Sequence, residues 1–223
     1  MFWFLHRACV VVFWCFWLAA AVFVYEKRAA LQPAFDYAEL VWQHDFRAAG
    51  DLPQLDGKVT EIFAGDSFQF EDKNGYAFNY GLAGVAAPRA NRGAPAELQR
   101  LAGDSRTNLS QLLAGRPVTV SVTLANPQTR TGLGLVHHGD TNVNVAMLAA
   151  GQGRLNLEQI RTLPLRDEFE MLRAERSARR QRLGIWGETS LTNDAAHGEM
   201  TVNPVSTWFR QVASLADFTR VGD

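Results

Sequence analysis

The sequence predicts an α+β fold, in which residues 55–187 form a five-stranded β-barrel of the oligonucleotide/oligosaccharide-binding (OB) type with helices packed against it. Polar and apolar residues alternate over 59–63 and 67–70, which is typical of half-buried strands. Asn74-Gly75 follows and is a favoured hairpin turn. Several short strands with a helix packed at one end indicate a small closed barrel rather than an open sheet.

The remaining elements of this domain follow from local patterns. Leucines at helical spacing predict a helix over 95–113, and Gly115 suits its end. β-branched residues predict a strand over 117–124. The further predicted elements are a third strand over 76–82, short strands over 133–137 and 141–145, a helical turn over 146–150, and a long helix over 165–183.

Residues 1–28 are predicted to be a single-pass membrane anchor. The 18 residues from Ala8 to Tyr25 carry no charge, and as a helix they would span ~27 Å, close to the ~30 Å hydrocarbon core of a bilayer. A cleaved signal peptide is the alternative, because residues 18–21 are similar to a cleavage site. Arg7 favours a cytoplasmic amino terminus, whereas Lys27 and Arg28 favour the opposite orientation. We expect a bacterial inner membrane with the domain on the periplasmic side.

Amphipathic segments are predicted on both sides of the domain. Residues 29–54 form a connector with an apolar helical stripe, and residues 188–223 form a linker followed by an amphipathic helix. Aromatic residues near the middle of the anchor are interpreted as lipid-exposed, and packing against partner helices, or against apolar cofactors held by a partner, is the alternative. The candidate partner contacts are Trp14, Trp17, Trp42, Trp208, Phe209, Arg89 and Arg92.

Charge and cysteine content restrict the functions that the domain can perform. The chain has a net charge of −1, and residues 51–187 contain 16 basic and 14 acidic residues. Nucleic-acid binders usually carry a clear basic excess, so nucleic acid is an unlikely partner. The two cysteines, Cys9 and Cys15, both lie in the predicted anchor, so the domain has no thiolate metal site. Five arginines of the 165–183 helix alternate in sequence with Glu168, Glu170 and Glu175, which predicts a solvated, salt-bridged face.

Four segments in the predicted barrel domain form an ordered set of motifs: Gly57–Phe68, Leu82–Pro88, Val143-Asn144 with Leu148 and Gly151, and Ala174-Glu175, Ala178-Arg179 with Gly184–Gly187. On these segments, residues 57–187 resemble the staphylococcal-nuclease-like (thermonuclease) domain. The first two are similar to its first hairpin, ending in Asp-Gly-Asp-Thr, and to its Leu-x-Gly-Ile-Asp-x-Pro segment. The last is similar to its closing helix and the Gly-Leu-Trp-Gly that follows.

The resemblance implies a site that cleaves phosphodiesters, but most of its residues are replaced. The family holds calcium with two aspartates, activates water with a glutamate and clamps the phosphate with two arginines. Of the aspartates, only Asp66 is kept. The replaced positions are Ala64 and Ala86 for aspartates, Gly81 and Leu133 for the arginines, and Arg89 for the glutamate. Calcium needs about six to eight oxygen ligands, so we expect no metal, no cofactor and no nuclease activity.

The sequence therefore favours a membrane-anchored, non-catalytic accessory or scaffold subunit that stabilises a larger membrane complex, such as a bioenergetic or light-harvesting one, by protein–protein contacts. One alternative is a tethered nuclease with a rebuilt site, for which Glu61, Glu71 and Asp72 are the nearby carboxylates. The other is a tethered binder of nucleic acid or another anion that uses Arg89, Arg92 and Arg130. His137 and His138 are adjacent and should point to opposite faces of a strand, which disfavours a paired metal site.

Overall fold

The chain divides into two compact units, which are described separately: Met1–Gln43 and His44–Asp223. The computed structural model describes residues 52–187 without a gap, and before them residues 13–19, 22–23, 27, 30–31, 34–35, 37–38 and 40–42. The predicted linker and C-terminal helix, with Trp208 and Phe209, lie outside the described residues, as does much of the predicted anchor and connector.

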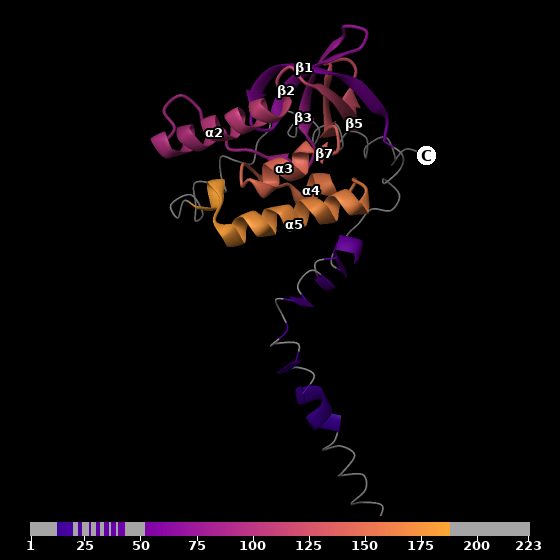
Figure 1. The fold of residues 1–223 in the computed structure, drawn as a ribbon, viewed down its shortest axis with the longest axis vertical. Coiled ribbons are helices and arrows are strands. Elements are labelled where there is room, and N and C mark those ends of the chain that lie inside the picture. Colours follow the sequence, from indigo (N-terminus) through magenta and orange to yellow (C-terminus); the bar gives the residue numbers. More distant parts are fainter. Residues whose placement is uncertain are drawn as a thin grey trace, which may run out of the picture. The chain divides into compact units, whose positions relative to one another are not determined.

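The second unit is built on a closed barrel of five strands (Figure 1). Strand β1 pairs antiparallel with β2 and with β5, β5 pairs with β6, and β2 pairs with β3. A parallel pairing of β3 with β6 closes the barrel. The prediction of a closed five-stranded barrel is therefore confirmed. The five strands are β1 (Gln54–Ala64), β2 (Ser67–Asp72), β3 (Ala77–Leu82), β5 (Pro117–Asn126) and β6 (Thr131–His138).

Alternation within the strands places the barrel core. Phe68 and Phe70 of β2 are fully buried, while the residues between and beside them are half-buried, as the period of two requires. The rings of Phe70 and Tyr80 meet edge to face with centroids 5.8 Å apart. Helix α2 (Ala96–Leu113) packs on β1 and buries Leu109 and Leu113. Its apolar face is the leucine stripe that the sequence predicted.

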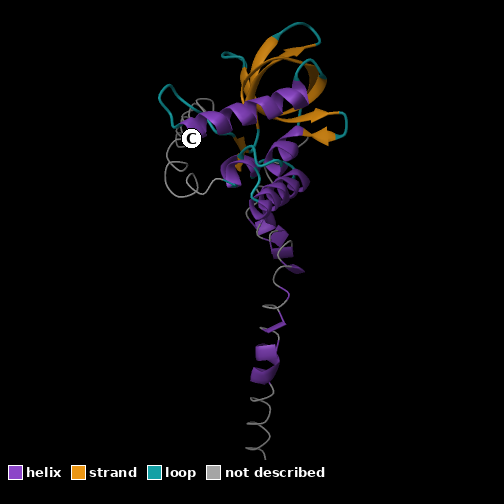
Figure 2. Ribbon diagram, turned by 60° about the vertical axis from the view of Figure 1, so that its left-hand side comes forward, coloured by secondary structure: helices purple, strands orange, loops and turns teal. Residues whose placement is uncertain are grey.

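The described part of this unit also contains three helices below the barrel, three short strands and a 3₁₀ turn (Figures 1 and 2). Helices α3 (Val143–Ala149) and α5 (Leu165–Gln181) pack on each other, and the single turn α4 (Leu157–Ile160) precedes α5. The short strands β4 (Val85–Ala86) and β8 (Arg154–Leu155) pair antiparallel, β7 (Thr141–Asn142) extends the sheet beside β6, and a 3₁₀ turn, η1 (Gly184–Trp186), follows α5.

The prediction of a strand over 141–145 is wrong after Asn142. Val143 begins α3, although valine favours strands, because the Asn142 side chain accepts a hydrogen bond from the Val145 amide at 3.2 Å and caps the helix. The long helix ends at Gln181, where Arg182 adopts a left-handed conformation with φ of 53°.

The described residues of the first unit are helical. Trp14 and Trp17 are exposed at 62% and 55%, and the Phe13 ring contacts both edge to face. Trp42 is 90% exposed. Within the residues described, no helix combines the length and the apolar character needed to cross a bilayer.

Candidate functional site: the Asp66–Arg89 centre

Asp66 lies in the tight turn between β1 and β2, and the turn is held on both sides. Its backbone oxygen accepts a hydrogen bond from the Leu82 amide at 2.9 Å, which ties the turn to the end of β3. Gly65 packs against the Ser105 side chain of α2 so closely that a Cβ at this position would clash with it. Ser105 is itself fixed by a 2.7 Å hydrogen bond to the Gln152 carbonyl. The turn therefore presents its carboxylate at a fixed place.

The Asp66 carboxylate is bound by an arginine and a backbone amide. Arg89 Nη2 lies 2.6 Å from Oδ1, and the Ala87 amide donates to Oδ2 at 3.3 Å. The Asp66 side chain is 3% exposed, and that of Arg89 is 28% exposed. Burial raises the pKa of Asp66 above its ordinary value, while the Arg89 charge and the hydrogen bonds act in the opposite direction. The sequence did not reveal that Arg89 binds Asp66.

The two positions that carry phosphate-clamping arginines in the resemblance are neighbours across the parallel β3–β6 ladder. Gly81 pairs with Leu133, and both are buried. The adjoining Gly132 is packed against the Tyr80 ring and leaves no room for a side chain. This wall of the centre therefore offers apolar surface where charged donors were expected by analogy, and it cannot clamp a phosphate through side chains.

The two remaining degenerate positions also lie beside the centre. Ala64 is the last residue of β1 and pairs with Ser67. Ala86 lies in β4, paired with Arg154 of β8 and three residues before Arg89. The structure thus brings together the predicted positions Ala64, Asp66, Gly81, Ala86, Arg89 and Leu133, although they come from four strands and two turns.

A buried asparagine braces the same region. Asn144, the first turn of α3, is 0% exposed. Its Oδ1 accepts from the Val136 amide at 2.9 Å, and its Nδ2 donates to the carbonyls of Ala83 at 2.8 Å and Gly134 at 3.1 Å. One amide therefore joins α3, β6 and the chain that leaves β3. The Val143-Asn144 motif marked the position in the sequence, but the pattern gave no indication of what the side chain binds.

The residues present do not fit a calcium ion at this centre. Calcium requires several oxygen ligands with substantial negative charge. Here the Asp66 carboxylate is already bound by a guanidinium group, and the neighbouring Ala64 and Ala86 offer only methyl groups. The 2.6 Å ion pair places a positive charge against the carboxylate that the ion would need. Across the described part of the chain, no group of three His, Cys, Asp or Glu residues is arranged to hold a metal.

The carboxylates considered for a rebuilt site are engaged elsewhere. Glu71 pairs with Lys58 Nζ at 3.1 Å, and Asp72 accepts the Asn74 and Tyr76 amides at 2.9 and 2.8 Å in the β2–β3 turn. Glu61 is exposed on β1 opposite Gln69. Asp72 follows Asp66 by six residues along β2, which corresponds to roughly 20 Å of extended strand. These groups do not converge on Asp66.

The arginines proposed for anion binding are spread out. Arg89 is bound by Asp66, Arg92 is exposed in the loop before α2, and Arg130 is exposed at the β5–β6 turn, where its φ is 51° and its carbonyl accepts the Asn79 amide at 2.8 Å. Whether Arg89 and Arg92 contact a partner stays a prediction.

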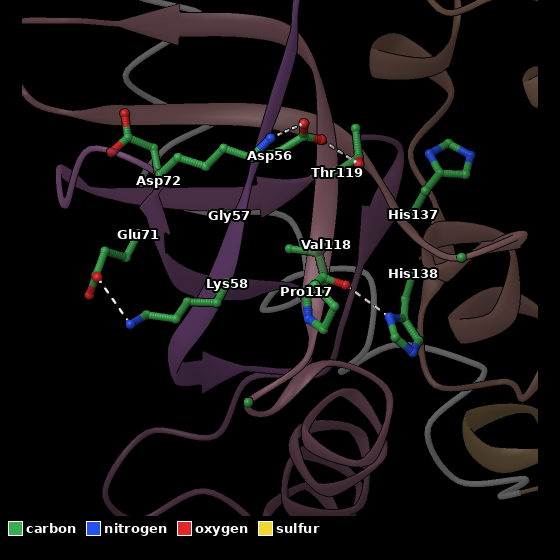
Figure 3. A pocket seen from close by; sticks show the side chains of 13 residues that line it. Asp56, Gly57, Lys58, Glu71, Asp72, Pro117, Val118, Thr119, His137 and His138 are labelled. Carbon is green, nitrogen blue, oxygen red and sulfur yellow. Dashed lines mark hydrogen bonds and ion pairs between the residues drawn. The ribbon is translucent and has the colours of Figure 1, made fainter.

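A separate cavity of about 880 Å³ opens on the barrel wall where β1, β2, β5 and β6 come together (Figure 3). Lys73 Nζ lies 2.8 Å from the Asp56 carboxylate, and Thr119 donates to the same group at 2.8 Å. His138 Nδ1 lies 2.9 Å from the Pro117 carbonyl, and His137 lines the wall beside it. Its two lysines are paired with Glu71 and Asp56, and its third carboxylate, Asp72, is bound by the Asn74 and Tyr76 amides, so each carboxylate of the cavity already has a partner.

Comparison with known proteins agrees with the geometry of the barrel. Residues 79–188 match the family model described as "Staphylococcal nuclease homologue". This match begins within β3 and ends just after η1, so it covers the β3–β6 closure, Arg89 and the closing helix. No curated protein matches the chain. The family match and the closed five-stranded barrel together show that this chain contains a staphylococcal-nuclease-like domain.

Proposed function

We propose that the chain is a membrane-anchored, non-catalytic scaffold subunit in which a staphylococcal-nuclease-like domain has lost its chemistry and serves protein–protein contacts. The observation that carries the proposal is the ion pair between Asp66 and Arg89 at 2.6 Å. It places a fixed positive charge against the one retained metal-binding carboxylate. Fold alone does not determine function, so the argument is made from this centre.

The loss of chemistry follows from the physics of phosphoryl transfer. Catalysis of this reaction depends on charged groups that stabilise the developing transition state, and removing one such group typically costs about 10²–10³ in rate. Gly81 and Leu133 are buried and apolar, so both phosphate donors are missing. Arg89 is positive and cannot act as the general base at the glutamate position. Several such losses in one site leave no pathway for efficient cleavage.

The scaffold role is supported by the exposed aromatic residues of the first unit. Trp14, Trp17 and Trp42 are all more than half exposed. Large exposed aromatic side chains are enriched at protein–protein and membrane-facing contacts, because their burial stabilises an interface strongly. The proposed setting is a single pass through a bacterial inner membrane beside integral membrane subunits.

A nuclease assay tests the loss of chemistry. Single-stranded and double-stranded DNA and RNA are incubated with the full-length protein and calcium. We expect the rate of cleavage to be no higher than with the Asp66→Ala variant. Cleavage by the wild-type protein clearly above that control would overturn the proposal, since it would show that Asp66 still takes part in hydrolysis.

A gain-of-function variant tests the cause of the loss. In Ala86→Asp/Arg89→Glu, two new carboxylates join Asp66 and the competing guanidinium is removed. We expect calcium to raise the thermal unfolding temperature of this variant and not that of the wild type, because a ligand at 100 times its Kd stabilises by about 2.7 kcal/mol. The matched control is Arg92→Glu, which changes a nearby exposed arginine only. Equal calcium stabilisation of the wild type would contradict the proposal.

Purification in mild detergent tests the scaffold role. We expect the protein from its own membranes to elute with integral membrane subunits, and substitution of Trp14 and Trp17 by alanine to weaken that association. Elution of the wild-type protein alone, under conditions in which other membrane complexes stay intact, would contradict the role.

A further inference from the structure

The outward face of α5 carries more positive charge than its sequence indicates. The sequence predicts a solvated, salt-bridged face, in which Glu168, Glu170 and Glu175 are interleaved with the arginines. The structure shows that Glu168 and Glu175 are 1% and 5% exposed and face the interior. Glu170 binds Arg166 Nε at 2.9 Å, and Glu175 binds Arg179 Nη2 at 3.1 Å, so the predicted salt bridges are present on this helix. Neither pair includes Arg173 or Arg180, which are exposed.

The arginines of this face lie along one line. Arg166, Arg173 and Arg180 follow one another at intervals of seven residues, which returns each to nearly the same side of an α-helix. At 1.5 Å per residue the line is roughly 21 Å long. Arg176 lies beside it, and we call these four residues the arginine stripe. Arg166 is paired with Glu170, so the positive charge that the stripe presents to solvent rests on Arg173 and Arg180.

Three of the four arginines of the stripe are exposed, and Arg176 is half-buried. Arg166, Arg173 and Arg180 are exposed, and the Arg173 guanidinium stacks over the Phe169 ring at 5.7 Å from its centroid. Burial and the positive charges of Arg179 and Arg180 lower the pKa of Arg176. The opposite side of α5 is anchored in the core through Met171 and Ala178. In Figure 1, α5 forms the lower edge of the domain, with α3 and α4 between it and the barrel.

We propose that the arginine stripe is a docking surface for the anionic phospholipid headgroups of the membrane that holds the chain. This inference rests on the membrane anchoring in the proposed function. Guanidinium groups bind phosphate oxygens through paired hydrogen bonds and remain charged at every physiological pH. A straight, convex helix face fits a flat layer of headgroups. Tethering raises the effective concentration of the bilayer around the domain, so individually weak contacts become populated.

A lipid surface agrees with the charge of the domain better than a nucleic acid does. Residues 51–187 carry 16 basic and 14 acidic residues, so the positive charge is local to this face and does not steer a long polyanion over the whole domain. Phe169 lies under Arg173 and is only half-buried, an arrangement that gives the stripe an apolar component at headgroup depth.

The test measures how close α5 lies to the membrane in the full-length chain. Ser177 lies on the outer side of α5, and Tyr76 is 58% exposed in the β2–β3 turn. Each is replaced by cysteine in a background in which Cys9 and Cys15 are alanine, and is labelled with a nitroxide. The protein is reconstituted into vesicles of phosphatidylcholine alone or mixed with phosphatidylglycerol. Accessibility of the label to a neutral, water-soluble nickel complex is measured by electron paramagnetic resonance.

We expect the label at Ser177 to become several-fold less accessible when phosphatidylglycerol is present, and the label at Tyr76 to be unaffected. High salt and the Arg173→Gln/Arg180→Gln variant should abolish this protection. The matched Arg106→Gln/Arg116→Gln variant, which removes two exposed charges elsewhere, should retain it. Thermal unfolding of both variants controls for folding.

Equal accessibility of the Ser177 label in the two membranes, or protection that survives Arg173→Gln/Arg180→Gln, would overturn the proposal. Protection by duplex DNA in phosphatidylcholine vesicles, with none from phosphatidylglycerol, would also overturn it and identify a nucleic acid as the partner. Alkaline carbonate extraction separates the two hypotheses. A chain washed off the vesicles contradicts the anchoring itself, whereas a chain that resists extraction with an accessible Ser177 label contradicts only the docking surface.

Discussion

Two aspartates at opposite ends of the β1–β2 hairpin form similar ion pairs in different surroundings. Asp56 binds Lys73 at 2.8 Å with its side chain 50% exposed, and Asp66 binds Arg89 at 2.6 Å with its side chain 3% exposed. The pKa of Asp56 is lowered, chiefly by the hydrogen bond from Lys73. The pKa of Asp66 is raised, because the cost of burial exceeds what Arg89 returns. Burial, rather than pairing, decides the direction of the shift.

This difference predicts at which of the two aspartates the loss of the ion-pair partner should destabilise the fold. At Asp56, water replaces a missing lysine at little cost, because exposed ion pairs contribute little to stability. At Asp66, water has no access, and a missing arginine leaves a buried charge without compensation. We therefore expect the Asp66–Arg89 centre to stabilise the fold, and the cavity at the other end of the hairpin to tolerate substitution.

The largest expected effect is that of Arg89→Ala. Breaking a buried pair from one side typically costs about 3–5 kcal/mol, and because Arg89 is partly exposed we expect about 3 kcal/mol at neutral pH, measured by chemical denaturation. Arg92→Ala, three residues further along in an exposed loop, is the control and should stay within about 0.5 kcal/mol. Asp66→Ala/Arg89→Ala should recover part of the loss. Equal stability of Arg89→Ala and Arg92→Ala would show that the buried Asp66–Arg89 pair does not stabilise the fold, and it would contradict the difference between this pair and the exposed pair at Asp56.

The Asn144 brace should have the next largest effect. Asn144→Leu keeps a side chain of similar size but leaves the Val136 amide without its side-chain acceptor and removes the hydrogen bonds to two buried carbonyls. We expect a loss of about 2 kcal/mol, the usual cost of an unsatisfied buried group, measured by thermal and chemical unfolding. Asn79→Leu, at an exposed position of β3, is the matched control. A loss no larger than that of Asn79→Leu would show that the brace is dispensable.

The sequence was sufficient for the parts of the fold that repeat a pattern. Alternation and Asn74-Gly75 predicted the first hairpins, and the leucine stripe predicted α2 to within a residue at its start. The two-residue strands β4 and β8 have no periodicity, so no pattern could indicate them. The prediction of a strand over 141–145 was wrong after Asn142, because the helix cap at Asn142 outweighs the strand preference of valine.

The candidate site was predictable in its positions but not in its interactions. The resemblance placed Asp66 and Arg89 in one centre, yet they are 23 residues apart and no local pattern shows that they bind each other. The sequence likewise did not predict that Glu168 and Glu175 are buried, since composition shows which charges a helix carries and not which of them face the interior.

A smaller effect concerns the pH dependence of Arg89→Ala. With a folded pKa above its unfolded value, Asp66 contributes stability that is fully present below the unfolded pKa and is lost as pH rises through the folded pKa. Without Arg89 the folded pKa should rise further. The stability gap between Arg89→Ala and the wild type should therefore narrow as the pH falls into the acid range, as measured by denaturant unfolding across pH. A gap that is constant with pH would show that the loss arises from packing and not from charge.

The smallest expected effect is that of Lys73→Ala, at the exposed end of the comparison. The folded pKa of Asp56 lies below its ordinary value of 3.8, so its contribution to stability is present above that value and is lost as pH falls through the folded pKa. Removing Lys73 should raise the Asp56 pKa towards 3.8, leaving only the Thr119 hydrogen bond to lower it, with little change in stability at neutral pH. An NMR titration of the Asp56 carboxyl measures the shift, with Lys58→Ala as the control because Lys58 pairs with Glu71 instead. If Lys73→Ala lost as much stability at neutral pH as Arg89→Ala, the prediction would be contradicted, because solvent exposure of Asp56 would not have reduced the cost of removing its partner.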